Sequence, residues 1–400
     1  MKRLFGKIFW TLVRNSRWDG VSRALGRVYL RLRPYAVFAG TPEDQEVRSA
    51  ICTIDGWFAW SSNPGEFSLR LNGALLDHLP LKRTDATRIF GERHCRGYRA
   101  FFDVSELSPV NGVVEVQLVE GEKVLATEPL RVSAEAIRDA EAARSRRAAK
   151  REWILDHVTC PAKQGDGSVL DFLPEELKQQ FRIDDPAAIS AHRYDEVAAG
   201  IIEEVRKAGG KVLDCGSGLR ANIDETVICV EVAALPTVDV LAVNQRLPFQ
   251  DSAFDAVLSL NVLEHVTDPF TCAAELVRVL KPGGTLYCCI PFLQPEHGYP
   301  HHYFNATRAG LRQLFAQQME PVRTFVPRSG EPIWSLSWFL SSYAAELPER
   351  ERQRFLNMRL RDIVNAPAQS LLDKNWVERL SEMGKWELAS TTAAVFRKAH

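Results

Sequence analysis

This sequence of 400 residues lacks several features that would place it in a particular class of protein. None of its eight cysteines belongs to a Cys-x-x-Cys pair, so no zinc ribbon or knuckle is expected, and the usage fits a reducing cytoplasm. The net charge of −1 gives no indication of a nucleic-acid partner. No apolar run is long enough to span a membrane, and Lys7 interrupts the first apolar run in a way that does not fit a signal peptide.

The N-terminal segment is basic and amphipathic. Residues 1–33 carry nine Lys or Arg and one acidic residue, Asp19, and their apolar residues recur at helical spacing. This pattern predicts an arm over residues 1–35. One interpretation is peripheral contact with a membrane surface through residues 1–33, where basic side chains meet anionic lipid head groups. The other is a helix docked on its own protein with a solvated basic face, and both interpretations stay open.

Residues 36–134 contain short β-type runs separated by turn signals. Asn72-Gly73 and Asn111-Gly112 are dipeptides that favour tight hairpin turns. The regular spacing predicts an antiparallel β-sandwich module. The pattern resembles small sandwich modules found beside bacterial sugar-transferring enzymes. The aromatic run Trp57 to Trp60 could form a sugar-stacking face, but a core position is favoured.

A change of pattern follows the β-rich region. Residues 135–184 are interpreted as a helical connector, charged over Glu135 to Arg151, and a loop. From residue 185 to residue 400, segments of strand and helix type alternate, beginning with a helix near Tyr194 to Lys207. Such alternation predicts an α/β fold with a doubly wound parallel sheet, because parallel neighbours need crossover connections. Four hundred residues also exceed what one core usually holds.

The most informative motif is the run KVLDCGSGL over residues 211–219, an apolar strand that leads into an acid and two glycines. Such a turn has no Cβ atoms in the way of a ligand at the carboxyl end of a sheet. It is followed by LPF at 247–249, FDAV at 254–257, LEH at 263–265 and RVLKPGG at 278–284. With these blocks in this order, the chain resembles the class I S-adenosylmethionine-dependent methyltransferases over about residues 190–320, most closely the type 11 subgroup. The resemblance implies a Rossmann-like methyltransferase sheet and S-adenosylmethionine as the cofactor.

The resemblance also implies which residues bind the cofactor. In the family, the acid of the first motif faces the methionine part and the glycines let it approach. Asp214, Gly216 and Gly218 occupy these positions, with Ser217 between the glycines. The acid that ends the second strand binds the ribose hydroxyls, and Glu231 occupies that place.

Adenine recognition departs from the family pattern. The acid that usually follows the third strand is replaced by Val243, with Asn244 beside it as a source of a carbonyl acceptor. The fourth strand, Ala256 to Leu260, brings Asn261 to the same edge of the sheet. Asn244 and Asn261 are therefore counted among the predicted cofactor-binding residues.

A nicotinamide dinucleotide site is the alternative, because Gly216, Gly218 and Ala221 satisfy G-x-G-x-x-A. A dinucleotide needs a helix N-terminus for its pyrophosphate. Only residues 219–225 precede the next strand, and Asn222 and Asp224 are poor helix formers. The methyltransferase interpretation is preferred.

The methyl acceptor is expected to bind beside a loop rich in proline and histidine, Pro291 to Phe304, which follows the fifth strand, Thr285 to Ile290. This segment is called the histidine loop. This loop resembles one branch of the family. Methyl transfer is an in-line displacement, and a hydroxyl acceptor profits from a general base. His297 is the first candidate for that base, followed by His301 and His265, because histidine titrates near neutrality. The alternative is that these histidines only hold their loops in place by hydrogen bonds.

No metal site is predicted among His297, His301 and His302. Gly298 and Pro300 prevent a shared helical face, and Glu296 is the one carboxylate near them. Residues 334–384 are interpreted as a helical insert that either covers the acceptor pocket or simply packs, and Trp386 to Arg397 as a last strand of the sheet.

The sequence thus favours a cytoplasmic S-adenosylmethionine-dependent methyltransferase, with possible attachment to the inner membrane face. The expected acceptor is a small molecule or glycan, in particular a sugar hydroxyl of a surface polysaccharide or of its lipid-linked precursor. The prediction of this acceptor rests on the family resemblance and on the basic N-terminal arm. One alternative is a methyltransferase for another small or lipid-like acceptor. A second alternative is a non-catalytic scaffold that keeps the fold and binds glycan or protein.

Overall fold

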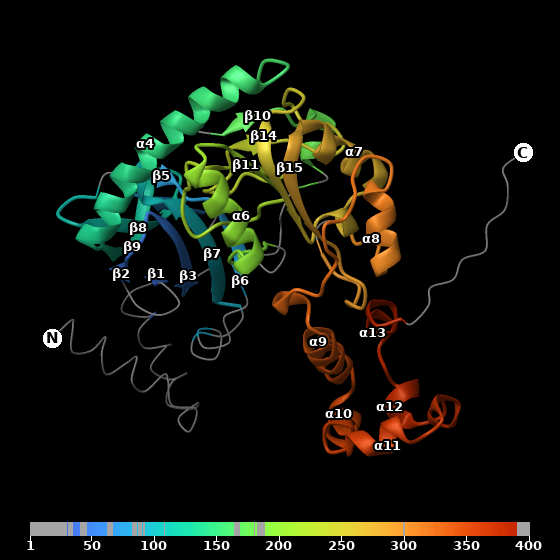
Figure 1. Ribbon diagram of the computed structural model, residues 1–400. Helices are drawn as coiled ribbons and strands as arrows, with labels where there is room; N and C mark the ends of the chain where they lie inside the picture. The colour runs from blue at the N-terminus through green and yellow to red at the C-terminus, as the bar shows by residue number, and fades with distance from the viewer. Residues whose placement is uncertain are drawn as a thin grey trace, which may run out of the picture.

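The computed structural model begins with β-sheets and ends with helices (Figure 1). It describes residues 30, 35–40, 46–61, 67–81, 86, 90, 93–107, 109–163, 169–179, 181, 189–298 and 301–389. The predicted basic arm over residues 1–33 therefore lies outside the described residues, apart from Leu30. Within the described ranges, no helix has the length and apolar character needed to cross a membrane.

Two sheets form the predicted sandwich. The first sheet is antiparallel, with the order β1 (Tyr35–Gly40), β3 (Ile51–Trp60), β7 (Cys95–Asp103) and β6 (His78–Leu81). The second has the order β2 (Glu46–Val47), β9 (Lys123–Val132), β8 (Val113–Glu120), β4 (Ser68–Leu71) and β5 (Ala74–Leu75), and only its β2–β9 pair is parallel. Asn72 and Gly73 join β4 to β5 with φ values of +49° and +86°. Both values are positive, as the predicted Asn-Gly turn requires.

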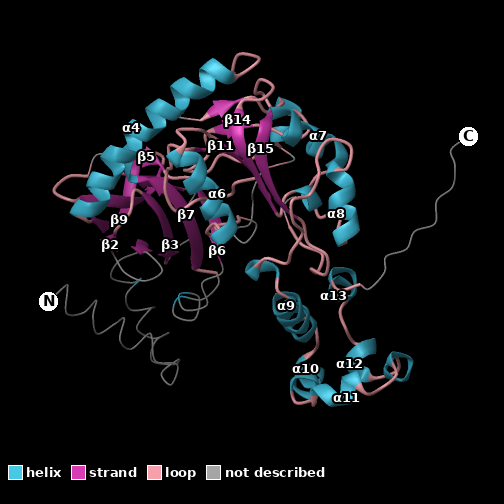
Figure 2. Ribbon diagram, in the orientation of Figure 1, coloured by secondary structure: helices cyan, strands magenta, loops and turns pink. Residues whose placement is uncertain are grey.

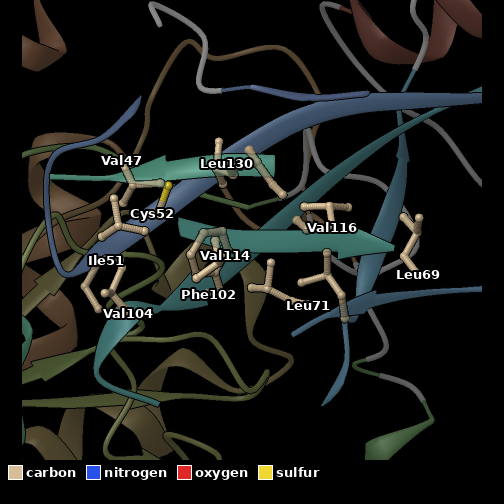
Figure 3. Close-up of a cluster of buried hydrophobic side chains, with 14 of the residues drawn as sticks. Val47, Ile51, Cys52, Leu69, Leu71, Phe102, Val104, Val114, Val116 and Leu130 are labelled. Carbon is tan, nitrogen blue, oxygen red and sulfur yellow. The ribbon is translucent and has the colours of Figure 1, made fainter. Parts of the chain in front are cut away.

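Alternate residues of the two sheets meet in one apolar core. Figure 3 shows Ile51 and Phe102 of the first sheet close to Val114, Val116 and Leu130 of the second. The aromatic residues Trp57, Phe58 and Trp60 are each no more than 4% exposed. They are core residues, as preferred from the sequence, and do not form an exposed sugar-stacking face.

The long helix α4 (Ala134–His157) connects the sandwich to the parallel sheet of the following domain. Ser133 caps its start, because the hydroxyl oxygen accepts a hydrogen bond from the backbone N–H of Ala136 at 3.0 Å. Ala136, Ala140 and Ala143 pack into the sandwich core, whereas Ile154 near the other end packs into the core of the following domain. Figure 1 shows the helix running across both parts.

The third sheet is parallel and six-stranded. Its order is β10 (Leu170–Asp171), β13 (Val240–Leu241), β12 (Val227–Glu231), β11 (Val212–Cys215), β14 (Phe254–Leu260) and β15 (Leu280–Cys289). The chain moves outward from β11 in one direction to β12 and β13, and in the other direction to β14 and β15. The strand order therefore reverses beside β11, which is where ligands bind in open α/β sheets.

Helices cover both faces of this sheet. Val212 and Leu258 pack with α6 (Glu196–Lys207) on one face. Their neighbours Leu213 and Val257 pack with α7 (Pro269–Val279) on the other face. Because successive strand residues point to opposite faces, this alternation establishes a doubly wound sheet. The predicted fold class, a Rossmann-like α/β sheet preceded by a β-sandwich, is confirmed.

The C-terminal region is helical in the described residues (Figure 2). Its elements are α8 (Arg308–Phe315), η5 (Arg328–Gly330), α9 (Pro332–Ala345), α10 (Glu349–Leu356), α11 (Leu360–Val364), η6 (Ala368–Leu371), α12 (Asn375–Glu378) and α13 (Glu382–Glu387). The remaining short helices are η2 (Val104–Glu106), α5 (Glu175–Lys178) and η4 (Leu263–His265). Ala344, Leu347, Phe355 and Leu380 form a small core of their own.

The strand expected over Trp386 to Arg397 is wrong at its beginning. Trp386 lies in α13, whose start is capped by Ser381, since that hydroxyl accepts a hydrogen bond from the N–H of Gly384 at 2.9 Å. Residues 390–397 lie outside the described part.

A buried ion pair connects α4 to the parallel sheet and generates a stability prediction. Lys150 Nζ lies 2.6 Å from Asp239 Oδ2, and their side chains are 1% and 7% exposed. Lys150→Ala leaves the carboxylate buried without a cation, and we expect it to lower the free energy of unfolding by about 3–5 kcal/mol. Urea unfolding followed by circular dichroism measures this loss.

Lys207→Ala is the matched control, because the Lys207 side chain is 74% exposed. We expect it to change stability by no more than about 0.5 kcal/mol. Equal effects of the two substitutions would show that the buried pair does not support the fold.

Candidate functional site

The glycine turn after β11 lies where the strand order reverses. Gly216 and Gly218 have φ values of +70° and +60°, which an L side chain rarely adopts. A Cβ atom on Gly216 would lie 2.5 Å from Val262 Cγ2, and one on Gly218 would lie 2.4 Å from the Ser190 carbonyl oxygen. The turn therefore needs glycine at both positions for two reasons, its backbone conformation and its close neighbours.

The residues after this turn form a loop. Residues 217–226 are all described and none of them is helical. The N–H of Leu219 donates to the Ser190 carbonyl at 2.8 Å, which ties the loop to the segment that precedes α6. A dinucleotide would need a helix N-terminus here for its pyrophosphate. The preference for a methyltransferase over a dinucleotide site is thus supported by the local structure.

Glu231 ends β12 and points back to the glycine turn. Its Oε2 atom accepts a hydrogen bond from the N–H of Gly218 at 3.0 Å, and its Oε1 atom accepts one from the N–H of Val232 at 2.8 Å. Burial raises the pKa of the carboxyl group, while these two bonds act in the opposite direction. Each carboxylate oxygen keeps a further lone pair, so the group can still accept from two adjacent hydroxyls.

Asp214 is fully buried and is bound by groups of its own chain. Its Oδ2 atom accepts hydrogen bonds from Tyr194 Oη at 2.6 Å and from Arg220 Nε at 2.9 Å. Burial raises the pKa of Asp214, and the charge of Arg220 opposes that rise. Its Oδ1 atom is buried and has no partner among the described residues. Only this second oxygen can accept from a bound ligand.

The other predicted cofactor residues lie at the same edge of the sheet. Ser217 is 1% exposed, and its hydroxyl donates to the Gly218 carbonyl at 3.2 Å. Its side chain therefore stabilises the glycine turn. Asn244 follows β13 in a turn and is 7% exposed. Asn261 follows β14, is exposed and has a φ of +57°. The three residues thus come from the ends of three strands.

Two of the three predicted histidines meet next to this edge. His265 in η4 and His297 in the loop after β15 have ring centroids 5.2 Å apart. His301 contributes its backbone carbonyl, which accepts a hydrogen bond from His265 Nδ1 at 2.9 Å, whereas its exposed ring contacts Tyr303. Of the three, His265 and His297 are therefore the residues that the structure brings together.

The two rings have a defined protonation pattern. His297 Nδ1 lies 2.8 Å from the Pro295 carbonyl oxygen. Because a carbonyl can only accept, Nδ1 carries the proton in both His265 and His297, and Nε2 is the unprotonated nitrogen of the neutral ring. Burial lowers the pKa of both histidines. Burial therefore favours the neutral form of both rings.

Glu264 is a site residue that the sequence analysis did not single out. Its side chain is 0% exposed, and neither carboxylate oxygen has a hydrogen-bond partner among the described residues. Burial raises its pKa from 4.5 to about 8. One ligand atom from each of Glu264, His265 and His297 lies within 4.8 Å of the others. The LEH block contains Glu264 and His265, but His297 comes from a loop that is distant in the sequence.

A cavity of about 580 Å³ lies elsewhere. Its lining includes Lys211 and Thr226, which precede β11 and β12, together with Arg146 of α4. It thus lies at the amino edge of the sheet. Ligands of doubly wound sheets bind at the carboxyl edge, so we place the functional site at the glycine turn rather than in this cavity.

Residues 217–288 match a protein-family model described as a methyltransferase domain. The chain is 31% identical over 157 residues to the ubiquinone/menaquinone biosynthesis C-methyltransferase of Saccharophagus degradans, which covers 36% of this chain and 62% of the relative. It is 32% identical over 165 residues to an uncharacterized methyltransferase of Mycobacterium sp. strain JLS, which covers 34% of this chain and 65% of that relative. A solved structure from Thermotoga maritima, titled an SAM-dependent methyltransferase and possible histamine N-methyltransferase, is 22% identical, covers 30% of this chain and 69% of its own, and has a TM-score of 0.23.

The family match falls inside the region that carries the motif blocks. The expectation of a class I S-adenosylmethionine-dependent methyltransferase domain is therefore confirmed, and S-adenosylmethionine is the methyl donor of that class. The chain spans less than two thirds of the length of the two curated relatives.

The buried carboxyl group of Glu264 generates a prediction on pH. Its pKa in the folded chain, about 8, exceeds the ordinary value of 4.5. The folded state therefore holds this proton more tightly than the unfolded state, and stability is lost as the pH rises from about 4.5 to about 8. The titratable groups that face it are His265, His297, Cys288 and Cys289.

Glu264→Gln removes this proton linkage. We expect the variant to match the parent protein near pH 5 and to exceed its unfolding free energy by roughly 3–5 kcal/mol near pH 9. Urea unfolding in chelator-containing buffer at both pH values gives the comparison. Glu296→Gln, at an exposed position of the histidine loop, is the control and should follow the parent protein. Parallel pH profiles for Glu264→Gln and the parent would contradict the raised pKa.

Proposed function

We propose that this chain transfers a methyl group from S-adenosylmethionine to a hydroxyl group of a sugar in a surface polysaccharide or its lipid-linked precursor. The observation that carries the methyl transfer is the glycine turn with Glu231 bound to its backbone, inside a chain segment that matches a methyltransferase domain. The choice of a sugar acceptor rests on the aromatic surroundings of His297.

The residues at the carboxyl edge fit the cofactor. Gly216 and Gly218 leave the backbone open to close approach, and the free lone pairs of Glu231 suit the two ribose hydroxyls. The unpartnered Oδ1 atom of Asp214 would accept from the ammonium of the methionine part. Asn244 is the candidate for adenine, and Asn261 borders the same edge. When bound, the cofactor supplies an activated methyl group on a sulfonium centre.

The acceptor side is formed by the histidine loop. His297 remains the first candidate for the base, followed by His301 and His265, because its neutral ring has an unprotonated Nε2. The cofactor would supply its methyl carbon to the acceptor oxygen, and its sulfur would keep the electron pair of the broken carbon–sulfur bond. His297 Nε2 would take the hydroxyl proton.

The aromatic surroundings of His297 support a sugar acceptor. Trp338 of α9 lies 5.0 Å from the His297 ring, measured between centroids, and Trp334 in the same helix is 63% exposed. Indole rings offer flat apolar faces on which sugar rings can stack, with a polar N–H at the edge. Exposed Ile333 and Leu336 on α9 would suit the lipid part of a lipid-linked precursor. The helical insert then covers the acceptor, which is one of its two predicted roles.

The proposed location is the cytoplasm, with peripheral contact to the inner membrane face through residues 1–33. Eight free thiols and a basic N-terminal segment support this location. Besides this membrane contact, the proposed partner is the acceptor, either a small molecule or a glycan, and no nucleic-acid partner is proposed.

One observation favours the non-catalytic alternative. Arg220 and Tyr194 already satisfy one oxygen of Asp214, so the motif acid is partly used within the protein. A scaffold that binds glycan or protein could keep such a closed site. A methyltransferase for another small or lipid-like acceptor would use the same cofactor residues and differ only at the histidine loop.

Cofactor binding tests the proposal directly. We expect the full chain to bind S-adenosylmethionine and S-adenosylhomocysteine in calorimetry with micromolar affinity, or about −8 kcal/mol. Glu231→Gln loses a charged acceptor and should weaken both by roughly 10–100-fold, and Asp214→Asn should weaken them as well.

Glu225→Gln is the matched control, because Glu225 is an exposed acid near the same loop and should leave binding unchanged. Absence of binding to the parent chain would overturn the methyltransferase proposal in favour of the scaffold. Binding that Glu231→Gln leaves intact would overturn the placement of the ribose.

A further inference from the structure

A cluster of possible metal ligands lies beside the proposed cofactor site. Glu264 and His265 come from η4, directly after β14, and His297 comes from the loop after β15. One ligand atom of each residue lies within 4.8 Å of the other two. Three donors from two separate segments thus converge at the carboxyl edge of the sheet.

The histidines are oriented as metal ligands usually are. Each ring donates its Nδ1 hydrogen to a backbone carbonyl, His265 to His301 at 2.9 Å and His297 to Pro295 at 2.8 Å. Such outer bonds fix the tautomer and the ring plane of ligating histidines and leave Nε2 as the donor to the metal. His302 supports the loop instead, because its Nδ1 accepts from the N–H of His297 at 3.3 Å and its Nε2 bonds Asn305.

Glu264 supplies an independent observation. Its carboxyl group is 0% exposed and both oxygens lack a hydrogen-bond partner among the described residues. His265 Nε2, at 3.8 Å from Oε1, is too distant for a hydrogen bond. A buried carboxylate without a partner is costly, and a protonated carboxyl group here would also lack an acceptor. A cation between the three side chains would satisfy the carboxylate and both Nε2 atoms.

We propose that Glu264, His265 and His297 bind a divalent transition-metal ion of the zinc type. Two imidazoles and one carboxylate are the donors of catalytic zinc sites with an open position, and of related iron sites. Magnesium and calcium prefer oxygen ligands alone.

The position of the cluster gives the ion a role that rests on the proposed methyl transfer. Val262, two residues before Glu264, contacts the glycine turn at Gly216. An ion with three protein ligands keeps a position for a fourth, and an acceptor hydroxyl bound there would have a lowered pKa. Its proton would then pass to bulk water, and the oxygen would attack the methyl carbon and displace the sulfur, which would keep the electron pair. With the ion bound, His265 and His297 would act as ligands, and this role would replace the base role proposed above for His297.

Metal binding can be measured without cofactor or acceptor. The full chain is treated with chelator, dialysed and titrated with Zn²⁺ by calorimetry, and with Co²⁺ by visible absorption. We expect one Zn²⁺ per chain and the intense visible bands of four-coordinate Co²⁺. Glu264→Gln and His297→Gln should each weaken Zn²⁺ binding by more than about 100-fold, beyond the usual effect of an outer-shell change.

His301→Ala is the matched control, because it removes a histidine ring of the same loop and keeps the carbonyl that orients His265. It should leave Zn²⁺ affinity unchanged. Circular dichroism and thermal unfolding of the metal-free variants separate lost ligands from lost folding, and Glu264→Gln should fold at least as stably as the parent. Absence of Zn²⁺ binding to the parent, or equal affinity in Glu264→Gln, would overturn the site. Zn²⁺ binding in a chain that fails to bind S-adenosylmethionine would support the metal site and sink only the methyltransferase proposal.

Discussion

The site depends on the parallel pairing of β11 with both β12 and β14. This pairing places the ends of three strands at one edge and leaves the backbone beyond Cys215 to turn without a helix. The N–H groups of Gly216 and Ser217 both donate to the Val230 carbonyl, at 2.9 and 3.1 Å, which fixes the turn against the end of β12. The next residue on β12, Glu231, can then reach back to Gly218. The glycine turn, the position of Glu231 and the position of η4 are consequences of the same strand order.

The two motif acids, Asp214 and Glu231, have different tasks, and Asp214 is fully buried whereas Glu231 is partly buried. Glu231 is held by backbone N–H groups, which satisfy one lone pair on each oxygen and leave the carboxylate free to accept more. Asp214 is held by a guanidinium and a phenol on a single oxygen. Arg220 also stacks on the Tyr194 ring at 4.2 Å, so these residues form one closed cluster. Asp214 therefore contributes to the rigidity of the site through Oδ2 and leaves only Oδ1 for a ligand, whereas Glu231 keeps a lone pair on each oxygen.

Local patterns in the sequence predicted most of the secondary-structure elements. They did not predict the contacts between segments that lie far apart in the sequence. The Asn-Gly turns, the parallel doubly wound sheet and the place of Glu231 at the end of a strand follow from residues close in sequence. The contacts of Tyr194 with Asp214 and of Glu264 with His297 depend on chain segments that return to the sheet from elsewhere. The histidine loop alone contains no buried carboxylate, so it does not predict the proposed metal site. Trp386 was predicted to lie in a strand but lies in a helix. Ser381, which caps that helix, was the local signal for it.

The β-sandwich is joined to the methyltransferase domain by a shared core and is not simply appended. Leu219 and Ile223, in the loop after the glycine turn, pack into the same apolar cluster as the sandwich residues, together with Leu235 and Val238. Arg147 of α4 reinforces the junction, since it donates to Asp103 Oδ2 at 2.6 Å and to the Pro236 carbonyl. The loop lacks a helix that could hold it in place, so apolar contact with the sandwich supplies that support. The sandwich thereby supports the loop after the glycine turn through packing.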